Sequence, residues 1–139
     1  MKVKAILETC LYATDLVATE AFYKEVLGLE PFSKAPGRYL FYYCGAGVLL
    51  IFNPAKSAVQ NIKISGSKIP QHGAAGEGHI CFKIKKPEIS DWRNWLIEKG
   101  VEIESEVTWD SGDKSIYFRD PAGNCLEVAS AGLWVLPEE

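Results

Sequence analysis

The 139-residue chain has only two histidines, no closely spaced cysteine pair, no run of basic residues and no long apolar segment. Its four cysteines are scattered, with no CxxC pair among them. That spacing argues against disulfides and against a thiolate metal site, and it predicts buried free thiols instead. The longest apolar stretch, residues 47–52, is far shorter than the ~20 residues of a membrane-spanning helix. We therefore expect no membrane partner.

An excess of positive charge is missing as well. The 15 Lys and Arg residues are outnumbered by 18 Asp and Glu, which gives a formal net charge of -3. A protein that binds nucleic acid usually carries a clustered basic face, so we expect no nucleic-acid partner. Residues 1–4 lead directly into a predicted strand without a signal-peptide core, which predicts a cytoplasmic location.

The apolar pattern predicts an α+β chain in which one strand and helix order occurs twice. In the first half, Asp15 is a natural helix N-cap and Gly28 a natural helix end. The expected elements of that half are a strand at 4–13, a helix at 16–27, and strands at 38–43 and 48–52. Those of the second half are a strand at 79–84, a helix at 87–99, and strands at 101–108, 114–119 and 125–129. The repeat units are then about 4–53 and 78–131, and 54–77 is a linker with at most one strand.

The repeat is visible in the residues themselves. The letters GLE at 28–30 match GVE at 100–102, and residues 39–51 match 116–128, each a strand, a Gly-containing turn and an apolar strand. Such self-similarity indicates two copies of one structural unit. When the two halves are aligned, Glu8 corresponds to His79, and Glu127 corresponds to Leu49 or Leu50.

Three predicted strands each carry an apolar row on one face and a metal-ligand residue type on the other. These residues are Glu8, His79 and Glu127. Imidazole and carboxylate groups are ordinary ligands of divalent cations, so the three strands could enclose one. The structural alternative is a buried, hydrogen-bonded pair of His79 and Glu127. Cys10, Cys81 and Cys125 stand two residues from these side chains, so they are placed to line the same cavity.

Four stretches carry a family resemblance: LYATDL at 11–16, AFYKEVLGL at 21–29, GHICF at 78–82 and YFRDPAGNCLE at 117–127. With them the chain resembles the vicinal oxygen chelate superfamily, which includes glyoxalase I, extradiol dioxygenases, fosfomycin-resistance transferases and bleomycin-resistance proteins. The resemblance covers nearly the whole chain and implies one such domain over residues 1–139. It implies two tandem βαβββ units that form a curved mixed sheet around a metal-binding cavity.

The resemblance also implies a site. Carried over residue by residue, the metal ligands are Glu8, His79 and Glu127, and Glu127 matches the catalytic base of the glyoxalases. The expected cofactor is one divalent ion, which can be Zn, Ni, Mn, Fe or Co. The expected activity is that of a glyoxalase-like lyase or isomerase acting on a small oxygenated metabolite. The family often completes its cavity across two chains, so a homodimer is expected.

Three other activities stay open. Ser115 and Tyr117 match the positions with which fosfomycin-type thiol transferases hold a phosphonate, and Arg119 points the same way. A metal-free drug-binding protein like the bleomycin-resistance proteins is the non-enzymatic alternative. An extradiol dioxygenase is the weakest alternative, because Glu8 replaces the first His of its ligand set.

Three further residues are candidates for binding the substrate. His72 lies in a polar loop before the second repeat, where it is either an exposed loop residue or close to a ligand at the cavity mouth. Trp109 and Arg38, like Tyr117, can line the pocket or cover the core.

Overall fold

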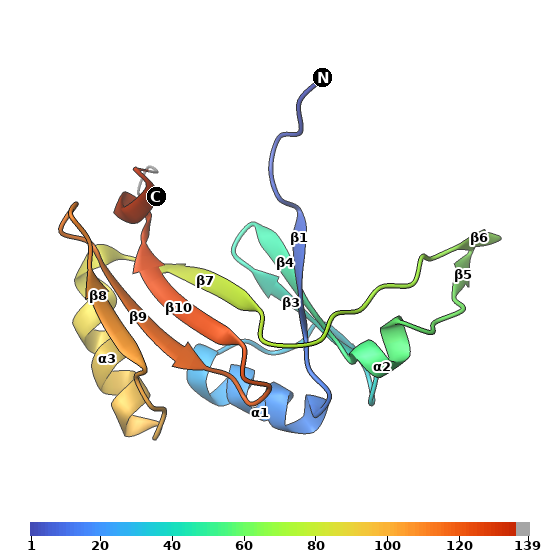
Figure 1. The fold of residues 1–139 in the computed structure, drawn as a ribbon, viewed down its shortest axis with the longest axis horizontal. Helices are drawn as coiled ribbons and strands as arrows, with labels where there is room; N and C mark the ends of the chain where they lie inside the picture. Colours follow the sequence, from blue (N-terminus) through green and yellow to red (C-terminus); the bar gives the residue numbers. More distant parts are fainter. Residues whose placement is uncertain (136–139) are drawn as a thin grey trace. The chain divides into compact units, whose positions relative to one another are not determined.

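The computed structural model describes residues 1–135 and forms two compact units, unit 1 (Met1–Gly76) and unit 2 (from Glu77) (Figure 1). Each unit holds a four-stranded sheet, with strand order β1-β4-β3-β2 in unit 1 and β7-β10-β9-β8 in unit 2. In both sheets the first strand pairs parallel to the last, and the other pairs are antiparallel. This confirms the α+β fold of two βαβββ units.

Unit 1 begins with a strand and a capped helix. Its elements are β1 (Glu8–Tyr12), α1 (Leu16–Leu27), β2 (Ser33–Ala35), β3 (Tyr39–Cys44), β4 (Gly47–Phe52), α2 (Pro54–Ser57), β5 (Lys63–Ile64) and β6 (Ser67–Lys68). The Asp15 carboxylate accepts the backbone N–H of Ala18 at 3.0 Å, which satisfies a free donor at the start of α1. The helix ends at Gly28, whose φ of 67° is the left-handed conformation that glycine adopts readily.

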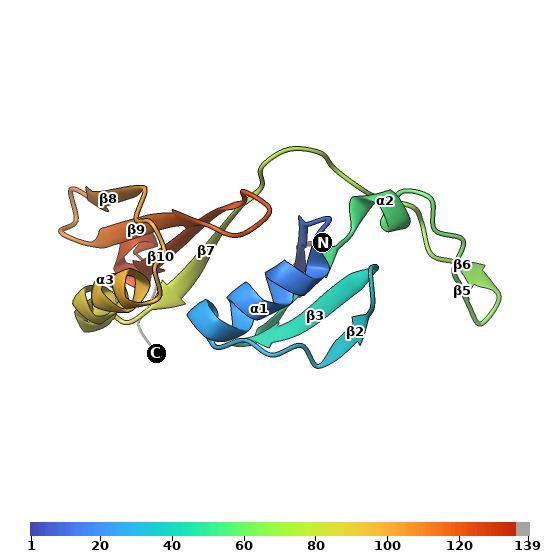
Figure 2. The same ribbon diagram turned by 90° about the horizontal axis from the view of Figure 1, so that it is seen from below.

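The two faces of the unit 1 sheet have different roles. One face packs against α1, which lies along β3 (Figure 2), and Tyr23 of the helix stacks on Tyr42 with 5.6 Å between ring centroids. Leu49 and Ile51 of β4 are buried on this side. Because side chains alternate along a strand, their neighbours Leu50 and Phe52 point to the opposite face. That opposite face is free to form a site.

Unit 2 repeats the pattern. Its elements are β7 (His79–Ile84), the 3-10 turn η1 (Lys86–Glu88), α3 (Ile89–Glu98), β8 (Ser105–Thr108), β9 (Lys114–Arg119), β10 (Cys125–Ser130) and the 3-10 turn η2 (Ala131–Trp134). Leu96 of α3 is fully buried, as are Ile116, Phe118 and Leu126 of the sheet. The core of unit 2 therefore lies between α3 and one face of its sheet.

A polar turn fixes the start of β7 beside β10. Asp120 accepts the backbone N–H groups of Ala122 and Asn124 at 3.0 and 2.9 Å. The side-chain oxygen of Asn124 in turn accepts the N–H of Gly78 at 2.8 Å. Asp and Asn commonly stabilise turns in this way. The turn thus places His79, the residue after Gly78, next to Cys125.

Several boundaries differ from the sequence prediction. The first strand is Glu8–Tyr12 and not 4–13, because of residues 4–7 only Leu7 bonds the sheet, through its carbonyl to Val48. The strand predicted at 101–108 is paired only over Ser105–Thr108. The short elements β2, α2 and β6 were not predicted. The expected burial of the thiols is wrong, since the cysteines are free but Cys81 is exposed and the other three are partly exposed.

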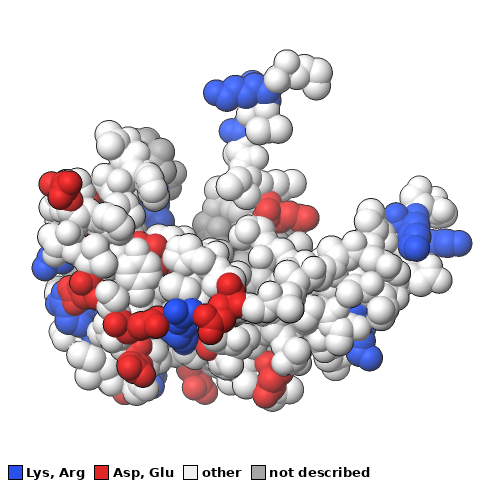
Figure 3. Space-filling model, in the orientation of Figure 1, with Lys and Arg blue, Asp and Glu red and all other residues white. Residues whose placement is uncertain are grey.

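The surface shows charge of both signs. Over unit 2, acidic and basic side chains are interspersed on the face seen in Figure 3. Unit 2 also contains ion pairs, as between Arg93 and Glu106 and between Lys86 and Asp113. Among residues 1–135, no helix has the length and apolar character needed to cross a membrane.

Candidate functional site

His79 and Glu127 meet on one face of the unit 2 sheet. They come from the neighbouring parallel strands β7 and β10, where His79 pairs with Cys125 and Cys81 pairs with Glu127. The Nε2 atom of His79 lies 3.4 Å from the Oε2 atom of Glu127. Tyr117 of β9 pairs with Glu127 of β10, and its ring stacks on the His79 imidazole with 6.3 Å between ring centroids. The structure thus brings together two of the three predicted metal ligands.

The contact made by His79 Nδ1 determines where the neutral imidazole carries its proton. Nδ1 lies 2.8 Å from the backbone carbonyl oxygen of Cys125, and a carbonyl only accepts hydrogen bonds. Nδ1 therefore carries a proton, and in the neutral ring the lone pair is on Nε2. A lone pair that faces a carboxylate at 3.4 Å is favourable only with a proton or a cation between them. Metal-binding histidines are commonly oriented by such a backbone hydrogen bond.

One oxygen of the Glu127 carboxylate has no hydrogen-bond partner among the described residues. This oxygen is Oε1, and the residue is only 5% exposed. An unsatisfied buried oxygen of a carboxylate is unfavourable, so it favours a bound cation or donor. Burial and the adjacent Glu127 carboxylate raise the pKa of Tyr117, so its hydroxyl keeps its proton. The chemistry of the pair fits a divalent cation.

Glu8, the third predicted ligand, belongs to unit 1. It lies on β1 in the register position of His79, since Glu8 pairs with Val48 as His79 pairs with Cys125. The same register places Leu50 at the position of Glu127, which decides between Leu49 and Leu50. Among residues 1–135, no group of three or more His, Cys, Asp or Glu side chains is arranged to hold a metal ion. The three-ligand set stays a prediction.

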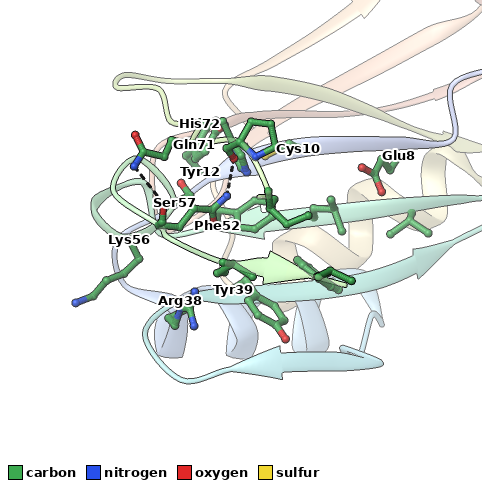
Figure 4. Close-up of a pocket in the computed structure, with 18 of the residues that line it drawn as sticks. Glu8, Cys10, Tyr12, Arg38, Tyr39, Phe52, Lys56, Ser57, Gln71 and His72 are labelled. Atoms are coloured by element: carbon green, nitrogen blue, oxygen red, sulfur yellow. Dashed lines mark hydrogen bonds between the residues drawn. The ribbon is translucent and has the colours of Figure 1, made fainter. Parts of the chain in front are cut away.

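A pocket of about 950 Å³ lies on the free face of the unit 1 sheet (Figure 4). Three predicted site residues line it: Glu8, Arg38 and His72. Arg38 and Lys56 lie at one end and Glu8 at the other (Figure 4). Cys10 also lines it, whereas Cys81 and Cys125 do not. The rest of the lining is mostly aromatic and aliphatic, supplied by β3, β4 and the segment 60–70.

A tyrosine and a histidine form a polar contact in this pocket. The Tyr12 hydroxyl lies 2.7 Å from Nδ1 of His72. Burial and the nearby Cys10 thiol raise the pKa of Tyr12 to about 12, so the hydroxyl stays protonated at neutral pH. The Tyr12 hydroxyl and His72 Nδ1 therefore share one hydrogen bond, and the tautomer of the imidazole decides which of the two donates. The imidazole packs edge-on against Phe52 with ring centroids 4.6 Å apart.

The candidate anion-binding residues of unit 2 are occupied by protein groups. Ser115 is fully buried, and its Oγ accepts the indole N–H of Trp109 at 2.9 Å. Arg119 donates from Nε to Glu104 at 2.8 Å and from Nη1 to Glu77 at 3.2 Å. A phosphonate would have to displace these partners to reach either side chain. Tyr117 alone of the predicted group stands beside Glu127.

Sequence reasoning missed most of the residues that line the unit 1 pocket, among them Tyr12, Lys56 and Ser57. Tyr12 could have been found, because it shares a strand face with Glu8 and Cys10. Lys56 and Ser57 lie on α2, whose single turn is too short to produce a helical pattern.

Comparisons with known proteins agree with this geometry. The model of the Glyoxalase/Bleomycin resistance protein/Dioxygenase superfamily matches residues 5–128. The crystal structure of lactoylglutathione lyase from Agrobacterium tumefaciens has a TM-score of 0.90 and 42% identity, covering 98% of this chain and all of that one. Metallothiol transferase FosB from Staphylococcus epidermidis is 29% identical over 134 residues, 96% of this chain and 86% of the transferase. The structure of virulence protein STM3117 from Salmonella typhimurium has a TM-score of 0.70 and 26% identity, covering 94% of this chain and 98% of that one.

Proposed function

Because the chain belongs to the Glyoxalase/Bleomycin resistance protein/Dioxygenase superfamily, we propose that it is a divalent-metal-dependent enzyme with glyoxalase-like lyase or isomerase activity. Its substrate is a small oxygenated metabolite, and it works in the cytoplasm. The observation that carries the proposal is the His79–Glu127 pair, in which a buried carboxylate lies 3.4 Å from the imidazole Nε2 while the Cys125 carbonyl orients the ring through Nδ1. The similarity to lactoylglutathione lyase supports the same reaction class.

The proposed metal ligands are Glu8, His79 and Glu127. Two carboxylates and one imidazole suit Zn, Ni, Mn, Fe or Co and leave coordination positions for a substrate oxygen. The strands that carry Glu8 and His79, β1 and β7, are both edge strands of their sheets. An edge strand can pair with another chain. We therefore propose a homodimer, in which Glu8 comes from either the same chain or a second copy.

The proposed chemistry uses the second carboxylate oxygen of Glu127. A bound divalent cation supplies Lewis-acid polarisation of a substrate oxygen. Glu127 Oε1, which has no protein partner among the described residues, takes a proton from the substrate carbon next to the carbonyl group. The same oxygen returns that proton to the neighbouring carbon or oxygen, which completes an isomerisation. The 5% exposure of Glu127 keeps bulk water from exchanging with the proton freely.

A thiol transferase is the second candidate, favoured by the similarity to metallothiol transferase FosB. In that reaction a thiol sulfur opens an anionic epoxide, and Ser115, Tyr117 and Arg119 would hold the anion. The contacts of Ser115 with Trp109 and of Arg119 with Glu104 weigh against it. We therefore place the lyase or isomerase reaction first.

The test compares two reactions on protein reconstituted with each candidate metal. One assay follows thioester formation from methylglyoxal and glutathione, and the other follows thiol addition to fosfomycin. Glu127→Gln keeps the shape of the side chain but removes the base, so it should lower the first rate by at least ~100-fold. The matched control Glu102→Gln lies on the surface of unit 2 and should leave the rate unchanged. Turnover of fosfomycin alone would replace the first candidate with the second.

A further inference from the structure

The unit 1 pocket is large and mostly apolar. Its volume of about 950 Å³ is at the upper end of pockets that hold drug-sized ligands, roughly 300–1,000 Å³. One wall is a group of rings: Tyr39 stacks on Phe41 at 4.0 Å between centroids, and Phe41 meets Phe52 edge-on at 5.4 Å. A compact phosphonate or dicarbonyl would fill little of this volume. A flat apolar body would cover the ring wall.

The segment after α2 adds apolar side chains that are exposed or partly exposed to solvent. Ile62, Ile64 and Ile69 line the pocket, and Ile64 and Ile69 are exposed to solvent. Leu50 of β4 lies on the same lining. Exposed apolar groups gathered around a concavity are typical of a binding site. A ligand that buried them would gain affinity from the hydrophobic effect.

The charge at one end of the pocket is available for a ligand. Arg38 and Lys56 both line this end, with the Lys56 side chain extending outward from the pocket (Figure 4), and no described acidic group forms an ion pair with either. Some other basic residues of the described chain have acidic partners, as Lys34 has Glu20 and Arg119 has Glu104. Two unpaired cations beside an apolar wall favour an anionic ligand group.

The polar groups inside the pocket offer further hydrogen bonds. Ser57 is 2% exposed, and its Oγ has no hydrogen-bond partner among the described residues. His72 engages Tyr12 through Nδ1, so its other ring nitrogen, Nε2, is not used in that contact. Buried polar groups are nearly always satisfied in the functional state, so the Ser57 hydroxyl indicates a ligand with a polar group.

We propose that this pocket binds the substrate, and that the substrate is an aromatic or similarly flat apolar organic anion. Its anionic group lies at Arg38 and Lys56, its apolar body lies on the Tyr39, Phe41 and Phe52 rings, and its oxygen function reaches Ser57 or His72. This substrate class rests on the proposed function, because it assigns the unit 1 pocket to the same enzyme.

The experiment uses two fluorescent probes on the full chain with a chelator present. 8-Anilino-1-naphthalenesulfonate has the proposed shape and charge, and N-phenyl-1-naphthylamine is the same molecule without the sulfonate. We expect one saturable sulfonate site per chain, bound more tightly than the neutral probe. The double variant Arg38→Gln/Lys56→Gln should weaken sulfonate binding by roughly 5-fold, as expected for two partly solvated ion pairs, and leave the neutral probe unchanged.

The matched control is Lys63→Gln/Lys68→Gln, which removes the same charge from the β5–β6 hairpin outside the pocket lining. It should bind both probes like the wild type. Both double variants change exposed side chains, and their melting temperatures will show that they are folded. Equal losses in the two double variants would contradict the proposal, as would tighter binding of the neutral probe or no binding of either probe.

A metal titration of the same samples separates the two claims. If metal binds and the probes do not, the substrate class is wrong and the metal-dependent enzyme stands. If the probes bind as expected and no metal is taken up, the pocket is a binding site but the proposed enzyme is wrong.

Discussion

Replacing Glu127 with leucine should stabilise the metal-free protein. Glu127 is almost completely buried, and its Oε1 has no partner among the described residues. Leaving a polar group buried and unsatisfied costs about 1–3 kcal/mol. The opposing term is the lost contact with His79, whose side chain is 52% exposed, so that contact contributes at most about 1 kcal/mol. Leucine also matches Leu50, the residue at the same register position of unit 1.

The expected gain is therefore up to about 2 kcal/mol in the free energy of unfolding, with each 1 kcal/mol raising the melting temperature by roughly 3 °C in a chain of this length. Urea and thermal unfolding followed by circular dichroism, with a chelator present, measure it. Glu102→Leu, an exposed change in the same unit, should stay within about 0.5 kcal/mol of the wild type. A Glu127→Leu protein less stable than the wild type would refute the reasoning, because the carboxylate would then have a structural role.

Adding metal should reverse the order of stability. A metal at 100 times its dissociation constant stabilises the folded state by about 2.7 kcal/mol when it does not bind the unfolded chain. The wild type should gain this stability and Glu127→Leu should not. The same residue would then destabilise the empty protein and stabilise the loaded one, which is the behaviour expected of a metal ligand and not of a core residue.

Three smaller predictions follow from single contacts. Ser57→Ala should raise the free energy of unfolding, measured in urea, by about 1 kcal/mol, because it removes a buried hydroxyl with no partner among the described residues. A decrease of that size in the free energy of unfolding would show that the hydroxyl does have a stabilising partner. His79→Gln should change the melting temperature little in the presence of chelator, since the His79 side chain is half-exposed, but it should abolish metal uptake. A folded variant that still takes up metal would show that His79 is not a ligand. Hydrogen bonds from Ser130 and Ser111 lower the pKa of Asp113 from its ordinary 3.8, so Asp113 adds stability above that pH and loses it as the pH falls through its lowered pKa. The difference in melting temperature between wild type and Asp113→Asn should therefore shrink in acid, and a difference independent of pH would be evidence against it.

Strand alternation and the internal repeat were enough to predict how the faces of the sheets are used. They placed His79 and Glu127 on one face of unit 2, and the structure has them 3.4 Å apart. They could not choose between Leu49 and Leu50 as the counterpart of Glu127, because both residues are apolar and adjacent. Only the backbone pairing of Cys10 with Leu50 decides the register.

The partners of the polar side chains could not be predicted. Alternation gives the face on which Arg119 lies, but Glu104 and Glu77, which bind it, are distant in sequence. The same holds for Trp109 and Ser115, whose contact depends on the turn between β8 and β9. The part of the unit 1 pocket lining that α2 supplies was missed for another reason, since a helix of one turn is too short to give a periodic pattern.

The most direct test of the central claim is the metal content of the protein, measured by mass spectrometry on untagged material after exposure to each candidate ion and removal of excess. The wild type should retain near-stoichiometric divalent metal, and Glu8→Ala, His79→Ala and Glu127→Ala should each lose it while remaining folded. Metal absent from the folded wild type, or retained by all three variants, would contradict the proposed site.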